Sequence, residues 1–387
     1  MKIVIAPDSY KESLSALEVA TEIEAGFREI FPDAAYLKIP MADGGEGTVA
    51  AMVAATNGTL VEVAVTGPLG KPVTACYGLT GDCKTAIIEM AAASGLALVA
   101  PNLRNPSKTT TYGTGELIKA ALDAGISHLI IGIGGSATND GGAGMLQALG
   151  VKLLDHGGRE IGFGGGELAN LDRIDISSMD FRLEACRIEA ACDVNNPLTG
   201  PKGASAVFGP QKGATPAMVA QLDDNLSHYA GLISRDLGVH VDTVPGAGAT
   251  GGMGAALLAF CGAILRPGIE IVMEAVGLEA AVQDADLVIT GEGRIDSQTI
   301  HGKTPIGVAR VAKHHGKPVI GIAGCLSSDV GVVHEYGIDA VFSVLSQVAT
   351  VDEALTHATE NVRAASRNIA ATLKLGLSCR NQRSGQE

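Results

Sequence analysis

Acidic side chains follow several of the predicted strands, and their placement suggests chemistry before any fold is assigned. They are Asp8 after "KIVIAP", Asp43 and Glu46 after "LKIPMA", Asp193 after "RIEAAC", and Glu292 and Asp296 after "DLVITG". A single such residue would be explained by helix N-capping, because a carboxylate accepts the free N–H groups of a first turn. Ligands of open α/β sheets, however, gather beyond the carboxyl ends of the strands. Several carboxylates that converge there need a cation, and Mg²⁺ carrying a nucleotide phosphate is a common solution.

Three basic side chains stand among these acids: Lys11, Arg294 and Lys303. Each could simply neutralise a neighbouring acid on a solvated surface. Acids, Mg²⁺ and basic donors are nevertheless the components of phosphoryl transfer, in which positioning and charge neutralisation do most of the work. The combination predicts a site for a phosphorylated ligand.

The segment "SQTIHGKT" differs from the Walker A pattern by one residue, since Ser297 stands in place of the first glycine. A true P-loop starts directly after its strand, whereas "GEGRID" here separates the strand "DLVIT" from the G-K-T. We interpret the stretch as a metal- and substrate-binding loop in front of a helix. Gly302 and Lys303 would lie at the start of that helix, where free N–H groups favour an anion.

A second glycine-rich segment, "GIGGSATNDGGAG", contains Gly132-x-Gly134-x-x-Ala137, a permitted form of the dinucleotide fingerprint, and Asp155 follows at a suitable distance. This pattern keeps an NAD-linked 2-hydroxy acid dehydrogenase open as an alternative. Against it, Asp140 falls inside the loop, where its charge would oppose a pyrophosphate, and the helix that follows is very short. A further match, Gly246-x-Gly248-x-x-Gly251, favours close packing of a helix, because Pro245 separates it from any strand.

The elements that must position these residues change character along the chain. "KIVIAP" (Lys2–Pro7) predicts a strand, and Ser15 with Glu18 forms a capping box at the helix that follows. Strand–loop–helix units at both ends of the chain are typical of a parallel α/β sheet. The runs "LVEVAVTG", "KPVTACYGLTG" and "KTAIIEM" instead predict an antiparallel meander. We expect a Rossmann- or flavodoxin-like domain from residues 1–59 and 266–387, with a mixed α/β domain of residues 60–265 inserted.

Composition restricts the possible partners. The chain has 387 residues, 46% hydrophobic and 18% charged, and a net charge of −14. Such an acidic protein is a poor partner for nucleic acid or for an anionic membrane, so neither is expected. The seven cysteines form no C-x-x-C pair and no secretory leader is recognisable, so we expect reduced thiols in a cytoplasmic protein. The sequence leaves monomer and homodimer open.

Taken in order, nine motifs resemble those of the bacterial type I glycerate kinases, also called glycerate 2-kinases. They are "APDSYKESLSA", "ADGGEGT", "EMAAASGL", "GTGELI", "GIGGSATNDGGAGM", "CDVNNPLTGPKGA", "FGPQKGA", "PGAGATGGMG" and "TGEGRIDSQTIHGK". The resemblance implies ATP-dependent phosphorylation of D-glycerate to 2-phosphoglycerate in the catabolism of glyoxylate, glucarate and galactarate. It also implies two α/β domains, one inserted in the other, with the active site in the cleft between them. One departure is Glu12, where many relatives have glycine.

On this basis we predict the following site residues. The catalytic residues are Asp193, expected to be the general base, with Lys11, Asp8 and Arg294. The substrate-binding residues are Ser9, Lys11, Arg294, Gln298 and Asn195, and the Mg²⁺ ligands are Glu292 and Asp296. The ATP-binding residues are Gly134, Gly135, Ser136, Gly141, Gly142, Gly302 and Lys303. Besides the dehydrogenase, a non-catalytic sugar-acid-binding protein is a second alternative, although no DNA-binding or signalling segment is recognisable.

Overall fold

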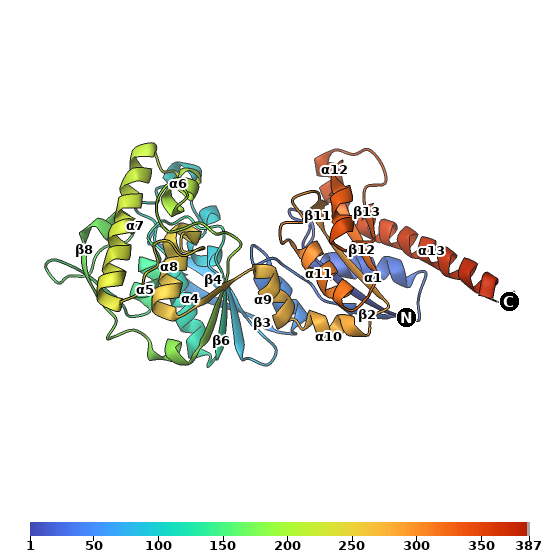
Figure 1. The fold of residues 1–387 in the computed structure, drawn as a ribbon, viewed down its shortest axis with the longest axis horizontal. Coiled ribbons are helices and arrows are strands. Elements are labelled where there is room, and N and C mark those ends of the chain that lie inside the picture. Colours follow the sequence, from blue (N-terminus) through green and yellow to red (C-terminus); the bar gives the residue numbers. More distant parts are fainter. Residues whose placement is uncertain (385–387) are drawn as a thin grey trace. The chain divides into compact units, whose positions relative to one another are not determined.

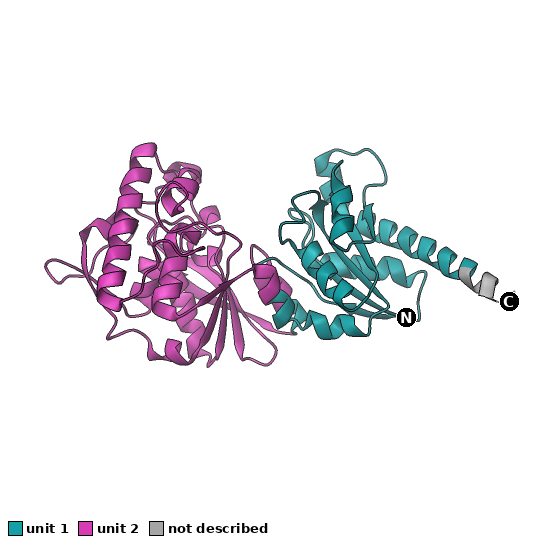
Figure 2. Ribbon diagram, viewed as in Figure 1, with its two compact units in different colours: residues 1–43, 54–56, 272–387 teal, residues 44–53, 57–271 magenta. Residues whose placement is uncertain are grey.

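The computed structural model describes residues 1–384, with side chains through residue 379. The chain forms two compact units (Figure 2). Unit 1 comprises Met1–Asp43, Ala54–Thr56 and the chain from Val272 onward, and unit 2 comprises Gly44–Val53 and Asn57–Ile271. Both ends of the chain therefore build one unit around an inserted second one, and this is the predicted α/β fold class.

Unit 1 contains a five-stranded sheet in which every pairing is parallel (Figure 1). Its order is β13 (Ala340–Ser343), β12 (Val319–Leu326), β11 (Leu287–Ile295), β1 (Lys2–Pro7) and β2 (Ala35–Lys38). The predicted strand Lys2–Pro7 is confirmed. β11 extends beyond the expected "DLVIT", because β12 pairs with it as far as Ile295 and Leu326. Glu292 and Arg294 therefore lie within a strand rather than in the predicted loop.

The helices of unit 1 cover both faces of its sheet. They are α1 (Ala16–Arg28), α10 (Leu278–Gln283), α11 (Thr304–His314), η6 (Val330–Tyr336), α12 (Val351–Thr356) and α13 (Ala358–Ser384). The predicted capping box of Ser15 and Glu18 starts α1, and Ile23 and Phe27 of α1 are fully buried against the sheet. α9 (Gly268–Ala275) and α10 are separate helices, because Gly277 takes a left-handed conformation between them.

Unit 2 contains a mixed sheet with the order β10 (Ile264–Arg266), β9 (Arg187–Ala191), β6 (His128–Gly132), β5 (Thr85–Glu89), β4 (Pro72–Leu79) and β3 (Thr59–Thr66). β3, β4 and β5 are antiparallel, which confirms the predicted meander, whereas β5, β6, β9 and β10 run parallel. A separate antiparallel pair consists of β7 (Lys152–Asp155) and β8 (Leu171–Asp175). β6 ends at Gly132, where the glycine-rich loop begins, and β9 ends at Ala191, two residues before Asp193.

The α-helices of unit 2 are α3 (Ala91–Ser94), α4 (Tyr112–Asp123), α5 (Ala143–Ala148), α6 (Ala204–Phe208), α7 (Pro216–Leu237) and α8 (Ala249–Cys261). Short 3-10 turns are η1 (Leu96–Leu98), η2 (Pro101–Leu103), η3 (Glu167–Asn170), η4 (Phe181–Ala185) and η5 (Pro210–Lys212). α2 (Thr48–Ala55) begins in unit 2. The expected boundary at residue 59 is too late for residues 44–53, because the Val49 N–H donates to Glu89 of β5. Within residues 1–384, no helix is long and apolar enough to cross a membrane.

Candidate functional site

Asp8 and Glu292 lie side by side where the neighbouring inner strands β1 and β11 pass Pro7 and Gly291. β1 and β11 are parallel neighbours with Pro7 opposite Gly291, and the Asp8 N–H donates to the Gly291 carbonyl at 2.8 Å. The next residues of the two strands are therefore the two predicted acids. The sheet topology brings together side chains that are far apart in the sequence.

The Asp8 carboxylate is held by short hydrogen bonds. The Thr304 hydroxyl donates to Oδ2 at 2.6 Å, and the Ser9 N–H donates to Oδ1 at 2.6 Å. Burial raises the pKa of the Asp8 carboxyl; the Thr304 hydrogen bond lowers it and the Asp43 charge raises it. Because the charge of this carboxylate is poorly solvated, the binding of a cation to it would be favourable.

Glu292 has a similar environment. The Thr299 hydroxyl donates to Oε1 at 2.7 Å, and the Lys303 ammonium lies 3.5 Å from Oε2. Burial raises the pKa of the Glu292 carboxyl, while Thr299 and Lys303 oppose the shift and the Asp8 charge adds to it. The charge of Asp8 thus acts on the Glu292 carboxyl, whereas the acid that acts on Asp8 is Asp43.

Other predicted residues of unit 1 are Arg294, Gln298 and Lys11. Arg294 is largely exposed and pairs with Asp296, with Nε 3.2 Å from Oδ2, and the Gln298 N–H donates to the same carboxylate at 2.9 Å. Lys11 is exposed, and within residues 1–384 its ammonium has no hydrogen-bond or ion-pair partner. A free ammonium and an exposed guanidinium are suited to an anionic substrate.

A tight turn carries Lys11. The Leu14 N–H donates to the Tyr10 carbonyl at 2.9 Å, and the Tyr10 N–H donates back to the Leu14 carbonyl at 2.8 Å. Glu12 within this turn has φ 68°, a left-handed conformation in which glycine is normally preferred. The position where the resemblance expects glycine is therefore one whose backbone favours it.

The residues of the predicted anion site, Gly302 and Lys303, lie at the start of α11. Lys303 occupies the N-cap position with no side-chain cap, and Pro305 lies in the first turn. Gly302 is exposed, with φ 87° and open space around it. Gly302 and Lys303 therefore precede a helix terminus that carries free N–H groups.

In unit 2, Asp193 and Asn195 follow β9, and both are exposed. The Gly268 N–H, at the start of α9, donates to Asp193 Oδ1 at 3.1 Å. This contact holds one carboxylate oxygen of the predicted base. The sequence placed Asp193 correctly beyond its strand.

The glycine-rich loop after β6 divides into an outer and an inner part. Gly134 and Gly135 are exposed, and a Cβ added to Gly134 would meet nothing within 4 Å. Gly141 and Gly142 are buried; the Gly141 N–H donates to the Gly251 carbonyl at 3.0 Å and the Gly142 N–H to Asp140 at 3.2 Å. The N–H groups of Gly141 and Gly142 cannot also bind phosphate, so we correct that prediction.

Comparisons with known proteins identify the family of this chain. The model of the glycerate kinase family matches residues 3–374. The chain belongs to the glycerate kinase family. It is 66% identical to the glycerate 2-kinase of Escherichia coli K12 over 97% of this chain and 99% of that one, and 61% identical to the glycerate kinase of Bacillus subtilis 168 over 97% and 98%. A crystal structure of a protein assigned as glycerate kinase 2, from Salmonella typhimurium LT2, matches with 67% identity and a TM-score of 0.92, over 98% of this chain and 99% of that one.

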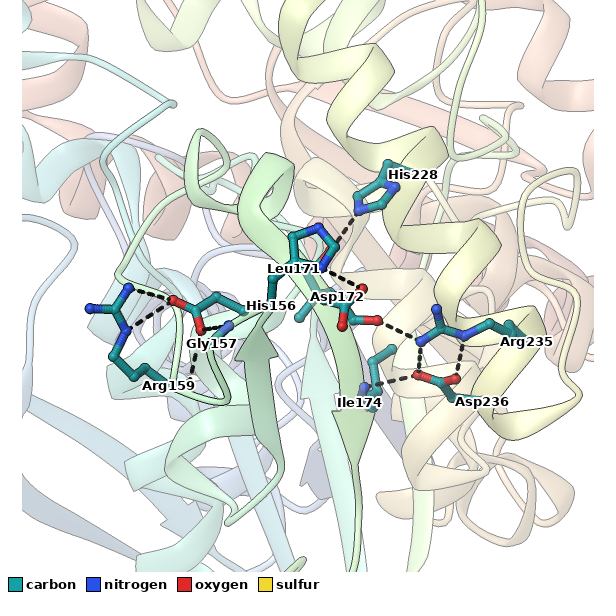
Figure 3. A network of polar contacts seen from close by, with 10 residues as sticks. His156, Gly157, Arg159, Leu171, Asp172, Ile174, His228, Arg235 and Asp236 are labelled. Carbon is teal, nitrogen blue, oxygen red and sulfur yellow. Dashed lines mark hydrogen bonds and ion pairs between the residues drawn. The ribbon is translucent and has the colours of Figure 1, made fainter.

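This family member does not have the dinucleotide-binding unit that its glycine pattern permits. β7, which would have to be the next parallel strand, pairs antiparallel with β8 outside the main sheet. Asp155 at its end accepts the Gly157 N–H at 2.8 Å and the Arg159 guanidinium. Figure 3 labels these two partners, Gly157 and Arg159. A ribose-binding acid would need a free carboxylate at the sheet edge, so the dehydrogenase alternative fails.

The residues of this kinase fit Mg²⁺ as a pair of carboxylates that leaves other ligand positions open for phosphate and water. Among residues 1–384, no group of three or more histidine, cysteine, aspartate or glutamate side chains is arranged to hold a metal. Mg²⁺ in kinases, however, is commonly held by one or two carboxylates together with substrate phosphates and water. Asp8 and Glu292 supply such a pair, whereas Asp296 is paired with Arg294.

Three residues with evident contacts were not predicted: Thr299, Thr304 and Lys212. The two threonines donate to Glu292 and Asp8, and Lys212 donates to Ser136 of the glycine-rich loop. Threonine carries no chemical signal in a sequence, so neither of them could have been found. Lys212 in "FGPQKGA" offered a weak signal of a functional role, because no acid within that motif could neutralise its charge.

Proposed function

We propose that this chain transfers the γ-phosphoryl group of ATP to the 2-hydroxyl of D-glycerate. The observation that carries the proposal is the 66% identity to the E. coli glycerate 2-kinase across 99% of that protein. The paired carboxylates of unit 1, with basic side chains around them, are consistent with phosphoryl transfer. We place the reaction in the cytoplasm, in the catabolism of glyoxylate, glucarate and galactarate.

In unit 1, we propose that Asp8 and Glu292 hold Mg²⁺, with Asp296 as a further candidate. The ion would neutralise phosphate charge and orient the transferred group. Lys11 and Arg294 would bind the glycerate carboxylate, because both cations are exposed. Ser9 and Gln298 would add hydrogen bonds to the same substrate, and Lys303 at the start of α11 would pair with a phosphate.

In unit 2, we propose that Asp193 is the general base and that Asn195 positions the substrate. The Asp193 carboxylate would take the proton of the 2-hydroxyl as the oxygen–phosphorus bond forms. The bond between the γ-phosphorus and the bridging oxygen breaks at the same time, and ADP leaves with the electron pair. Gly134, Gly135 and Ser136 would bind the phosphate chain through N–H groups and a hydroxyl.

One assay separates this proposal from its alternative. Incubation with ATP, Mg²⁺ and D-glycerate, followed by ³¹P NMR, should give ADP and 2-phosphoglycerate. A sugar-acid-binding protein would be stabilised by glycerate against heat without turnover. Production of 3-phosphoglycerate would overturn the proposed position of transfer.

Two substitutions test the assigned roles. Asp193→Asn should lower kcat by about 10²–10⁴-fold, the usual contribution of a general base. The exposed Asp224→Asn of α7 is the matched control and should have no effect. Arg294→Ala should raise the KM for glycerate far more than the KM for ATP, with the exposed Arg310→Ala of α11 as its control. A kcat loss below about tenfold for Asp193→Asn would remove its role as the base.

A further inference from the structure

The glycine-rich loop of unit 2 encloses a lysine that the proposed mechanism does not use. Lys212, the last residue of η5, is only 2% exposed. Its Nζ donates to the Ser136 hydroxyl oxygen at 2.7 Å and to the Thr138 carbonyl at 2.6 Å. Lysine is almost never fully buried unless it is paired, so a buried ammonium bound to this loop needs a reason.

Other contacts fix the same segment from its inner side. The Leu96 N–H donates to the Gly135 carbonyl at 2.8 Å, and the Ala137 N–H donates to the Ser94 carbonyl at 2.9 Å. The Thr109 hydroxyl donates to the Ala137 carbonyl at 2.8 Å. Several carbonyls of the loop therefore point inward, and within residues 1–384 the Gly134 and Gly135 N–H groups donate to no other protein group.

The charge of Lys212 lies behind this outer face. Burial lowers the pKa of Lys212 to about 7, and the charge of Asp140 opposes the shift. Asp140 itself is fully buried and accepts the Thr111 N–H and hydroxyl at 2.8 and 2.9 Å. A charge in a buried environment is weakly screened, so the ammonium acts on an anion at the loop more strongly than a surface lysine would.

We propose that Lys212 is a positioning residue of the nucleotide-phosphate loop: its ammonium fixes Ser136 and Thr138 so that the Gly134 and Gly135 N–H groups face a phosphate of ATP. The inference rests on the proposed role of this loop in ATP binding. Lys212 does not itself contact the substrate. It differs from a P-loop lysine, which reaches the phosphates directly.

The test compares three variants of the full chain. Lys212→Met removes the charge at similar length, Lys212→Arg keeps it, and Lys152→Met changes an exposed lysine of β7 with no assigned role. Steady-state kinetics give kcat and the KM for ATP and for glycerate. Melting curves show whether each variant is folded.

We expect Lys212→Met to raise the KM for ATP by about tenfold or more and to change the KM for glycerate by less than about twofold. Lys212→Arg should recover most of the ATP affinity, and Lys152→Met should match the parent. An unchanged KM for ATP, or an equal rise in both KM values, would overturn the proposal. If Lys212→Met does not fold, the pH dependence of ATP affinity in the parent and in Lys212→Arg decides, and parallel profiles would then refute the proposal.

A second readout is the pH dependence of ATP affinity. The parent should lose affinity as Lys212 is deprotonated above its pKa of about 7, whereas Lys212→Arg should not, because arginine stays charged. Parallel pH profiles would overturn the proposal. Calorimetric binding of AMP-PNP with Mg²⁺ applies the same comparison without turnover. If the protein binds AMP-PNP but does not phosphorylate glycerate, the proposed function is refuted. The proposal for Lys212 would still be tested by the difference in AMP-PNP affinity between the parent and the variants.

Discussion

Glu12→Gly should stabilise unit 1, although it removes a side chain. Glu12 is exposed and has φ 68°, a left-handed conformation that costs a residue with a Cβ about 1–2 kcal/mol. Glycine adopts this conformation freely, but its unfolded chain has more conformational freedom, which offsets about 0.5–1 kcal/mol. The difference predicts a gain of about 0.5–1 kcal/mol in the free energy of unfolding.

Urea unfolding and thermal melting measure this gain. A stabilisation of this size should raise the melting temperature of a unit of this size by about 1–4 °C. The matched control is Glu335→Gly in η6, an exposed glutamate whose backbone is right-handed, and it should lose about 0.5–1 kcal/mol. If both substitutions destabilise equally, the backbone at Glu12 is not under strain and the reasoning is wrong.

Three further predictions follow from contacts described above. Ser15→Ala removes the capping box of α1 and should lower the free energy of unfolding by about 0.5–2 kcal/mol in urea titrations; an unchanged midpoint would contradict it. Thr304→Val removes a hydrogen bond that lowers the pKa of Asp8, so that pKa should rise further. Because the ionised form binds Mg²⁺, the low-pH limb of the kcat/KM profile should move to higher pH, and an unmoved limb would exclude Asp8. Gly134→Ala, whose Cβ meets open space, should leave the melting temperature unchanged but raise the KM for ATP. The control Gly231→Ala in α7 should leave the KM for ATP unchanged and raise the melting temperature slightly, because alanine is favoured over glycine inside a helix.

The sequence predicted the features that depend on local patterns. The strand Lys2–Pro7, the capping box of Ser15 and Glu18, and the meander of β3, β4 and β5 each follow from neighbouring residues. The acids expected beyond the strands were located in part: Asp8 follows β1 directly, whereas Glu292 lies inside β11, next to Asp8 in the neighbouring strand. Alternation of side chains and short turns carry this information without tertiary contacts.

The failures have a common physical origin in contacts between distant segments. The end of β11 is set by its pairing with β12, not by its own "GEGRI". The N–H of Gly141 is used by the Gly251 carbonyl, more than a hundred residues away in the chain. The burial of Lys212 depends on Ser136 and Thr138, which a reader of "FGPQKGA" cannot place. Propensity and motif spacing do not encode such pairings.

The position of β1 in its sheet has a consequence for synthesis on the ribosome. β1 lies between β2 and β11, and the Lys2 N–H donates to Asp286, 284 residues later. Until β11 has been translated, β1 and β2 form at most a two-stranded pair, which is marginally stable alone. Unit 2 is nearly continuous in sequence and has no such delay. The inserted unit should therefore fold first on the nascent chain, while the N-terminal strands wait for their partner.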